Sequence, residues 1–227
     1  MIKQAVILAA GKGKRMNENS TDHKLKTIPK PLLDLKGKPM IEHKINGLVE
    51  NNIEICTVIN KNDEHIFREK LKHYEINYCY QDEPLGTGNA LYAAKDFVKD
   101  ELFLVMMGDD LTEYNIKELS DAKEPAVFGF EVEDVTGYGA LVVNNGIVDG
   151  IIEKQLSGRG IINTGVFIMP KEFFDYYDEI KAIAKKEILL TDAPEILSFH
   201  GIKFKLKKLD RWFGINTPDE LNSANRL

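Results

Sequence analysis

The stretch QAVILAAGKGKRM, residues 4–16, decides the fold. Residues 4–10 are almost all apolar, and Gly11 and Gly13 follow them directly, with Arg15 just behind. A short buried strand that ends in a glycine turn is typical of α/β proteins that bind phosphate, because the turn lets backbone N–H groups face an anion. An arginine there can add a forked pair of hydrogen bonds. We therefore expect a strand followed by an anion-binding loop.

The loop differs from the two best-known glycine-rich phosphate loops. The dinucleotide-binding fingerprint requires a third glycine three residues after the second, and this chain has Met16 there. The kinase-type P-loop requires two glycines five residues apart, followed by Lys-Ser or Lys-Thr, and residues 8–16 lack that pattern as well. A third kind of phosphate loop remains.

The rest of the chain alternates strand-like apolar runs with amphipathic segments of helical period, which predicts a parallel sheet covered by helices. In the first half we expect strands at 4–10, 53–60, 76–81 and 101–109, and helices at 39–52, 63–74 and 86–98. The second half is richer in strands and includes a hairpin turn at 144–146. There we expect strands at 125–132, 139–154, 160–170 and 202–209, helices at 171–185 and 192–199, and a last helix capped by Thr217.

Composition limits the class of protein. The 227 residues are 43% hydrophobic and 29% charged, as in an ordinary globular protein, and we expect one domain with halves at 1–110 and 111–227. The net charge of −6 argues against a nucleic-acid partner. No apolar run is long enough to span a membrane and no signal peptide is evident, so we expect a cytoplasmic protein. Cys56 and Cys79 lack metal-ligand spacing and are expected as buried free thiols.

Positive charge is nevertheless concentrated near the glycine loop. Residues 11–38 hold eight Lys or Arg against three Asp or Glu, which suits a small polyanion, although a solvated lysine-rich loop would show the same excess. Within this region Pro29 and Pro31 flank Lys30. Two prolines are expected to hold the lysine on a stiff, extended segment, as a fixed point charge.

The motifs LAAGKGKRM (8–16) and PKPLLDLKGKPMIEH (29–43) resemble the signature of the sugar-phosphate nucleotidyltransferases, also called nucleoside-diphosphate-sugar pyrophosphorylases. The resemblance is greatest to the uridylyltransferase domain of UDP-N-acetylglucosamine pyrophosphorylases. It extends over nearly the whole chain, because further motifs recur in the family's order. These are QDEPLGTGNAL (81–91), MMGDD (106–110), GYGALVV (137–143), GIIEKQ (150–155), INTGVFIM (162–169), LLTDAPEIL (189–197) and FGINTPDEL (213–221).

The resemblance implies a Rossmann-like, GT-A-like three-layer α/β sandwich with a mixed, mostly parallel central sheet and a smaller antiparallel sugar-binding part. It implies a reaction in which a sugar 1-phosphate attacks the α-phosphorus of a nucleoside triphosphate and releases pyrophosphate, with Mg²⁺ as cofactor. Arg15 matches the residue that clamps the triphosphate, and Lys30 matches the lysine between the two phosphates. Asp109 matches a catalytic metal ligand, and Asn216 matches the second ligand. Asp110 departs from the usual pattern, and capping the next turn is favoured over sharing the metal.

The resemblance also assigns binding residues. The nucleotide-binding positions are Leu8, Ala10, Gly11, Gly13, Gln81, Gly86 and Thr87. The sugar-binding positions are Gly139, Glu153, Lys154, Asn163 and Thr164. Structural explanations stay open for some of them, since Thr87 could be a helix N-cap and Gly139 a strand bend.

The leading expectation is transfer of UMP to N-acetylglucosamine 1-phosphate or glucose 1-phosphate. The alternatives are transfer of dTMP, CMP or GMP, transfer to another acceptor such as phosphocholine, and a non-catalytic nucleotide-sugar sensor. Residues 1–227 contain no hexapeptide repeat, so no acetyltransferase domain is expected. The oligomeric state stays open, with a homo-oligomer as one alternative.

Overall fold

The computed structural model describes the chain except for residues 12, 14–15, 17–26, 113–114 and 227. Its centre is a nine-stranded sheet with the order β5-β4-β1-β6-β11-β8-β12-β10-β9. The strands are β1 (Gln4–Leu8), β4 (Glu54–Ile59), β5 (Asn77–Tyr80), β6 (Leu102–Met107), β8 (Ala126–Val132), β9 (Gly139–Asn144), β10 (Ile147–Glu153), β11 (Gly160–Pro170) and β12 (Phe204–Lys208). The first four of these are parallel to one another, and antiparallel pairing begins where β11 joins β6.

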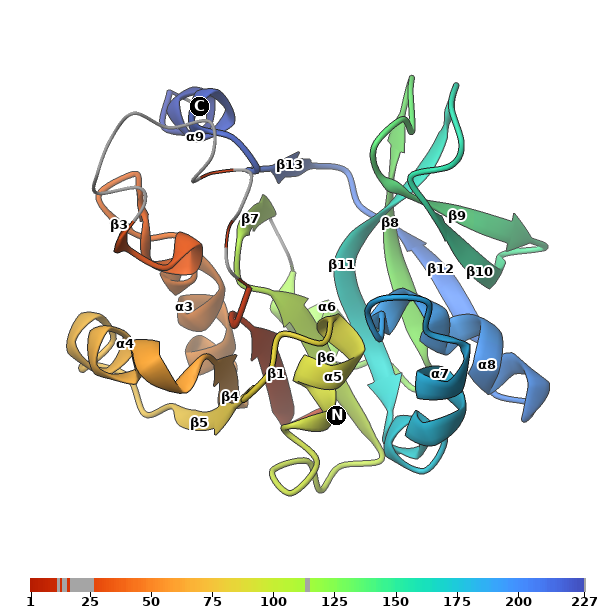
Figure 1. Cartoon of the computed structure of the whole chain (residues 1–227), viewed down its shortest axis with the longest axis horizontal. Helices are drawn as coiled ribbons and strands as arrows, with labels where there is room; N and C mark the ends of the chain where they lie inside the picture. Colours follow the sequence, from red (N-terminus) through yellow and green to blue (C-terminus); the bar gives the residue numbers. More distant parts are fainter. Residues whose placement is uncertain (12, 14–15, 17–26, 113–114, 227) are drawn as a thin grey trace.

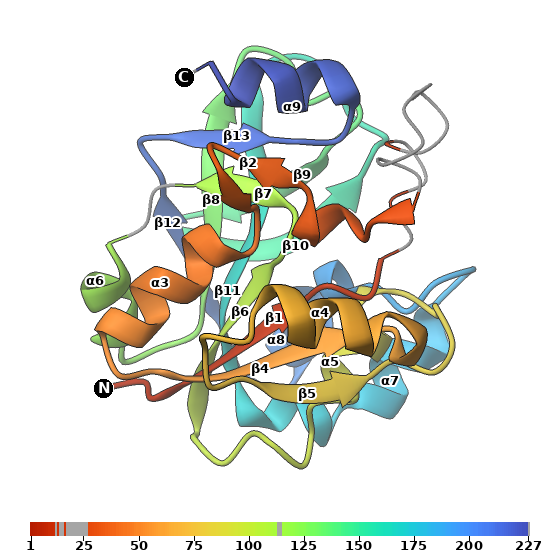
Figure 2. The same ribbon diagram turned by 90° about the vertical axis from the view of Figure 1, so that its left-hand side faces the viewer.

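Helices cover both faces of this sheet (Figures 1 and 2). One face packs on α5 (Thr87–Tyr92), α7 (Tyr177–Ile183) and α8 (Ala193–Phe199), and the other on α3 (Glu42–Glu50), α4 (Glu64–Lys70) and α6 (Ile116–Ser120). Strand β1 shows why, because Val6 and Leu8 belong to the first core cluster while Ala5 and Ile7 belong to the second. Successive side chains of a strand point to opposite faces. The three-layer α/β sandwich is therefore confirmed.

The C-terminal segment crosses back to the first half of the chain. Strand β13 (Trp212–Gly214) pairs with β7 (Asp110–Thr112), and α9 (Pro218–Ala224) packs against the small β2 (Asp34–Leu35) and β3 (Lys38–Pro39) hairpin. Thr217 caps α9 as expected, in a reciprocal capping box with Glu220. The expected hairpin also forms, with Asn145 and Gly146 both in the left-handed region between β9 and β10.

Several expected elements differ in extent. The helix expected over 86–98 ends as an α-helix at Tyr92 and continues as turns, and the segment 171–185 divides into a 3-10 turn (η3, Lys171–Phe174) and α7. Cys56 is buried as expected, and its thiol donates to Sγ of Cys79 at 3.0 Å, but Cys79 is only partly buried. No described helix is long and apolar enough to cross a membrane.

Candidate active site

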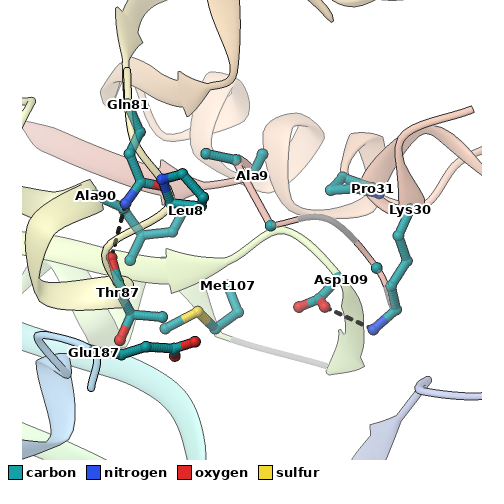
Figure 3. Close-up of a pocket in the computed structure, with 15 residues that line it drawn as sticks. Leu8, Ala9, Lys30, Pro31, Gln81, Thr87, Ala90, Met107, Asp109 and Glu187 are labelled. Atoms are coloured by element: carbon teal, nitrogen blue, oxygen red, sulfur yellow. Dashed lines mark hydrogen bonds and ion pairs between the residues drawn. The ribbon is translucent and has the colours of Figure 1, made fainter. Parts of the chain in front are cut away.

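The sheet places its ligand crevice where its connections change direction. From β1 the chain moves outward through β4 and β5, then returns to β6 on the other side of β1. Ligands of open α/β sheets bind at such a point, beyond the carboxyl ends of the strands. A cavity of about 340 Å³, here called the loop cavity, lies there (Figure 3). It is lined by Leu8, Ala9, Ala10, Gly11, Gly13, Lys30, Pro31, Gln81, Pro84, Gly86, Thr87, Ala90, Met107, Asp109 and Glu187.

Every described residue of the expected nucleotide set lines this cavity, as do Lys30 and Asp109; Arg15 lies outside the described residues. The loop after β1 is pinned near its start, since the amide of Gly108 donates to the carbonyl of Leu8. Gly13 has a φ of 58°, and a Cβ there would lie 3.3 Å from Cβ of Lys30. A glycine therefore permits the loop and the lysine to approach each other.

Lys30 is a buried cation at the crevice. Its side chain is 7% exposed, and Nζ donates to Oδ2 of Asp109 at 2.6 Å (Figure 3). The expected extended segment is wrong in one respect, because Lys30 begins a 3-10 turn, η1 (Lys30–Leu32). Only Pro29 is extended, and its carbonyl accepts from the Leu32 amide. Lys30 is buried within this turn, and Asp109, 41% exposed, pairs with its ammonium at the cavity wall.

The segment after β5 forms the opposite wall. Gly86 has a φ of 117°, and a Cβ there would lie 2.4 Å from the carbonyl oxygen of Ile188. Thr87 is the first residue of α5 rather than its N-cap, so the capping explanation is wrong. Its Oγ1 instead accepts from the amide of Leu190 at 2.9 Å. These contacts join the chain near residue 87 to the chain near residue 188 as one wall.

A second cavity of about 250 Å³, here called the strand cavity, adjoins the first and shares Thr87, Met107 and Asp109 with it. Its other lining residues come mainly from the antiparallel part of the sheet and from β13. They include Gly139, Glu153, Lys154, Asn163, Thr164 and Asn216, which are the expected sugar set and the second expected metal ligand. The structure therefore brings the two expected sets together around one shared rim.

The strand cavity holds its polar groups in different ways. Gly139 pairs with Glu153 across β9 and β10, and a Cβ at Gly139 would lie 2.9 Å from Oε1 of Glu153, so the glycine leaves room for the carboxylate. The Thr164 hydroxyl donates to the carbonyl of Phe128, and Oδ1 of Asn163 accepts from the amide of Gly165. Lys154 is exposed, with a φ of 56°. Thr164 is thus held by the sheet itself.

The acidic pair at the end of β6 divides its tasks. Asp109 faces both cavities, whereas the buried Asp110 pairs with Nζ of Lys44 at 2.9 Å, and the Lys44 ammonium also donates to the Asp110 carbonyl at 2.6 Å. The Asp110 carboxylate therefore forms a buried ion pair, and the turn that it was expected to cap includes residues 113–114, which lie outside the described residues. Asp109 and Asn216 both line the strand cavity and offer oxygen donors of the kind that Mg²⁺ prefers. They fit a Mg²⁺ ion that completes its shell with phosphate and water.

Sequence reasoning missed several lining residues. Glu187 reaches the loop cavity, and Thr191 and Trp212 line the strand cavity, from segments far along the chain. Oγ1 of Thr191 and Nε1 of Trp212 are buried without a hydrogen-bond partner among the described residues. The LLTD and FGINT motifs marked these neighbourhoods, but nothing in them singled out these side chains.

The fold and the site define an open α/β sheet protein with a glycine loop and two adjoining cavities beyond the carboxyl ends of its parallel strands. The particular family follows from comparison with known proteins. Residues 4–227 match the model of the family described as nucleotidyl transferase, and the chain belongs to that family.

Named relatives agree with this assignment. The chain is 32% identical over 231 residues to the bifunctional protein GlmU of Methanococcus maripaludis, covering 97% of this chain and 53% of the relative. It is also 32% identical to a bifunctional sugar-1-phosphate nucleotidylyltransferase/acetyltransferase of Sulfurisphaera tokodaii, covering 98% of this chain and 55% of the relative. The chain thus spans about half the length of these curated relatives.

Solved structures share the fold over nearly the full chain. HddC from Yersinia pseudotuberculosis is 26% identical with a TM-score of 0.76, covering 99% of both chains. A putative glucose-1-phosphate thymidylyltransferase from Bacillus anthracis has a TM-score of 0.80 at 24% identity, covering 98% of this chain and 94% of that chain, and supports the fold alone.

Proposed function

We propose that this protein transfers a nucleoside monophosphate, first of all UMP, from a nucleoside triphosphate to a sugar 1-phosphate and releases pyrophosphate. The observation that carries the proposal is the meeting of the two cavities at Asp109, with the buried Lys30 beside it. One cavity offers glycine backbone and an amide side chain, and the other offers polar side chains suited to hydroxyl groups. Two phosphorylated ligands bound there would present their phosphates to each other at the shared rim.

The chemistry requires little more than charge and alignment. An oxygen of the sugar 1-phosphate attacks the α-phosphorus, a new P–O bond forms, and the bond to the β-phosphate oxygen breaks to free pyrophosphate. Because negative charge concentrates at one phosphorus, a fixed cation at that point lowers the barrier. Lys30 is such a cation, since burial and its turn hold it in place. We assign Arg15 to the triphosphate on the family resemblance.

Asp109 and Asn216 are the residues that would hold Mg²⁺. When bound, Mg²⁺ neutralises phosphate charge and orients the phosphates for in-line displacement. Asp109 has a second task in this proposal. It pairs with Lys30 at 2.6 Å, so it keeps the ammonium at the rim when the phosphates are absent.

The sugar is proposed to occupy the strand cavity. Glu153 would accept from a ring hydroxyl, the amide of Asn163 would contact the substituent at the 2-position, and Lys154 would reach the phosphate. Gly139 makes room for Glu153, and Thr164 stiffens β11 behind Asn163 through its bond to Phe128. N-acetylglucosamine 1-phosphate and glucose 1-phosphate are the proposed acceptors. On this proposal residues 1–110 bind the nucleotide and 111–227 bind the sugar within one domain.

Pyrophosphate release tests the proposal directly. UTP, dTTP, CTP and GTP are each incubated with N-acetylglucosamine 1-phosphate, glucose 1-phosphate and phosphocholine, with and without Mg²⁺. We expect the fastest release with UTP and a sugar 1-phosphate, and loss of release on chelation of Mg²⁺. If pyrophosphate is released only with another nucleotide, or only with phosphocholine, that compound replaces UTP or the sugar 1-phosphate as the proposed substrate. Nucleotide-sugar binding without any release would overturn the enzymatic proposal in favour of a sensor.

A further inference from the structure

One side chain in the wall of the loop cavity, Gln81, already donates its hydrogen bonds to other protein groups. Gln81 is 6% exposed and lines the cavity. Its Nε2 donates to the carbonyl of Gly86 at 2.9 Å and to Oδ1 of Asn89 at 3.0 Å. A primary amide nitrogen has two hydrogens, and both are used. Among the described residues, every side-chain hydrogen bond of Gln81 runs from this nitrogen, so the carbonyl oxygen Oε1 is left for a ligand.

The orientation of this amide follows from chemistry. A backbone carbonyl can only accept, so the nitrogen of Gln81 has to face Gly86. The second hydrogen then requires an acceptor, which directs Oδ1 of Asn89 toward Gln81. Asn89 must in turn direct its own nitrogen away, and Nδ2 donates to the hydroxyl of Tyr177 at 3.1 Å. Each bond determines the next, from the cavity wall to α7.

Both ends of this series are held rigidly. The ring of Tyr177 is buried and stacks on Tyr92 with a centroid distance of 3.9 Å and an interplanar angle of 20°. Near Gly86, the amide of Ile188 donates to Leu85 and the amide of Gly88 donates to Ile188, so the wall that carries the Gly86 carbonyl cannot shift freely. A buried hydrogen-bond series with fixed ends keeps one orientation.

We propose that Asn89 and Tyr177 are positioning residues that hold the Gln81 amide in one orientation, with its oxygen toward the nucleobase. The cavity then selects a base with a ring N–H donor over a base with a ring nitrogen acceptor. The inference rests on the proposed function and specifies its nucleotide. Uracil and thymine present N3–H to such an oxygen. Cytosine presents a bare N3, whose lone pair would face Oε1 and leave two buried acceptors unpaired. Guanine carries N1–H and passes the same filter, whereas adenine does not.

The substitution Asn89→Leu tests the positioning residue without changing Gln81, the residue proposed to contact the base. It removes the acceptor for the second hydrogen of Gln81 and leaves Gln81 itself intact. That hydrogen can then turn toward the base and donate to N3 of cytosine. We expect the ratio of kcat/KM for UTP to that for CTP to fall by about tenfold or more, the effect of one mispaired buried polar group. The change should lie in KM, because neither Asn89 nor Gln81 contacts the reacting phosphorus.

Two further variants complete the experiment. Asn89→Asp keeps an acceptor oxygen toward Gln81 and should retain the wild-type ratio. Tyr177→Phe keeps the stacked ring and removes only the hydroxyl that fixes Asn89, so its ratio should fall between those of the wild type and Asn89→Leu. Calorimetric binding of UMP and CMP to each variant should give the same order without any turnover. Circular dichroism and the melting temperature confirm that each variant is folded.

Failure of this inference differs from failure of the proposed function. Suppose that the wild type prefers UTP and that folded Asn89→Leu keeps the same ratio of kcat/KM for UTP to that for CTP. The proposed role of Asn89 and Tyr177 is then wrong, and the proposed function stands. A wild type that prefers CTP to UTP contradicts the proposed selection by the Gln81 oxygen directly. If the wild type transfers neither UMP nor dTMP, the proposed nucleotide is wrong. The role of Asn89 and Tyr177 is then tested by comparing the binding of GMP and AMP, because guanine carries a hydrogen on N1 and adenine does not. Equal loss of selectivity in Asn89→Asp and Asn89→Leu would also overturn it.

Discussion

The two cavities that meet at Asp109 are built from different parts of the sheet, and they are held to different degrees. The loop cavity lies at the ends of parallel strands, and Gln81 and Lys30 in its wall are both less than 10% exposed and bonded to other protein groups. The strand cavity lies on β9, β10, β11 and β13, and Glu153, Asn163 and Asn216 in its wall are all half-buried.

This difference separates two kinds of specificity. The loop cavity is set before a ligand arrives, because changing one of its residues breaks a bond to a distant segment, as with the Lys30–Asp109 bond across 79 residues. In the strand cavity Glu153, Asn163 and Asn216 are half-buried, although Thr164 and Thr191 in the same wall are buried. We therefore expect changes at the buried, bonded residues to affect stability or catalysis, and changes around the half-buried residues of the strand cavity to affect acceptor affinity.

The largest effect is expected at a buried ion pair within residues 1–110, which includes Asp110 of the strand-cavity wall. Lys44 of α3 and Asp110 of β7 form a pair in which both side chains are under 10% exposed. Lys44→Met leaves a buried carboxylate without that cation and should lower the free energy of unfolding by about 3–5 kcal/mol. The double variant Lys44→Met/Asp110→Leu should recover most of it. Urea unfolding measures both.

The surface pair of Arg68 and Glu64 is the control, since it spans one turn of α4 and its side chains are 57% and 28% exposed. Arg68→Met should cost far less than Lys44→Met, because solvent screens an exposed pair. Equal costs for the two variants would show that burial does not strengthen the Lys44–Asp110 pair.

The next effect concerns the rim. Lys30→Met keeps the length of the side chain and removes the charge, so kcat should fall by about 10²–10³-fold, the usual effect of losing one fixed group that stabilises transition-state charge. The KM for the nucleotide should change much less. Steady-state pyrophosphate release measures both constants, and Lys36→Met, an exposed lysine a few residues away, serves as the control. A change in KM with kcat intact would make Lys30 a binding residue only.

A smaller effect is expected in the strand cavity. Gly139→Ala places a methyl group 2.9 Å from Oε1 of Glu153 and should displace that carboxylate. The KM for the sugar 1-phosphate should rise by about tenfold, as for one lost hydrogen bond, with the KM for UTP unchanged. Gly150→Ala on the same strand pair is the control, because its methyl group would meet only Oε2 of Glu195 at 3.8 Å. A rise in the UTP KM instead would contradict the division between the cavities.

The fold could be predicted where local chemistry decides it. Strand–helix alternation, the Asn145–Gly146 turn and the Thr217 capping box all depend on residues near one another, and all three appear in the structure. The pairs β2–β3 and β7–β13 were missed, because strands of two or three residues show no period. The early end of α5 also has no local signal.

The candidate site could be predicted from motifs that resemble the family, but not from the contacts that hold it. The residues expected to bind nucleotide and sugar line two adjoining cavities, apart from Arg15, which the structure does not describe. Lys44 pairs with Asp110 across 66 residues, and Gln81 is fixed through Tyr177. Such pairings depend on how distant elements pack, so one sequence cannot specify them.

The smallest effect is a pH dependence beside the strand cavity. Burial, with the negative charges of Glu195 and Glu153 nearby, raises the pKa of Asp192 above its usual range. Folding therefore favours the protonated form, and this contribution to stability is present at acidic pH and lost as pH rises through the raised pKa. Asp192→Asn should raise the melting temperature more at neutral pH than near pH 4, about the ordinary pKa of an aspartate.

Asp134 is the control and should show the opposite pH dependence of stability, because hydrogen bonds from Thr136 and Gly158 lower the pKa of its carboxyl. Asp134→Asn should thus destabilise the protein more at neutral pH than near pH 4. If both variants shifted in the same direction with pH, the electrostatic contrast at Asp192 would be wrong.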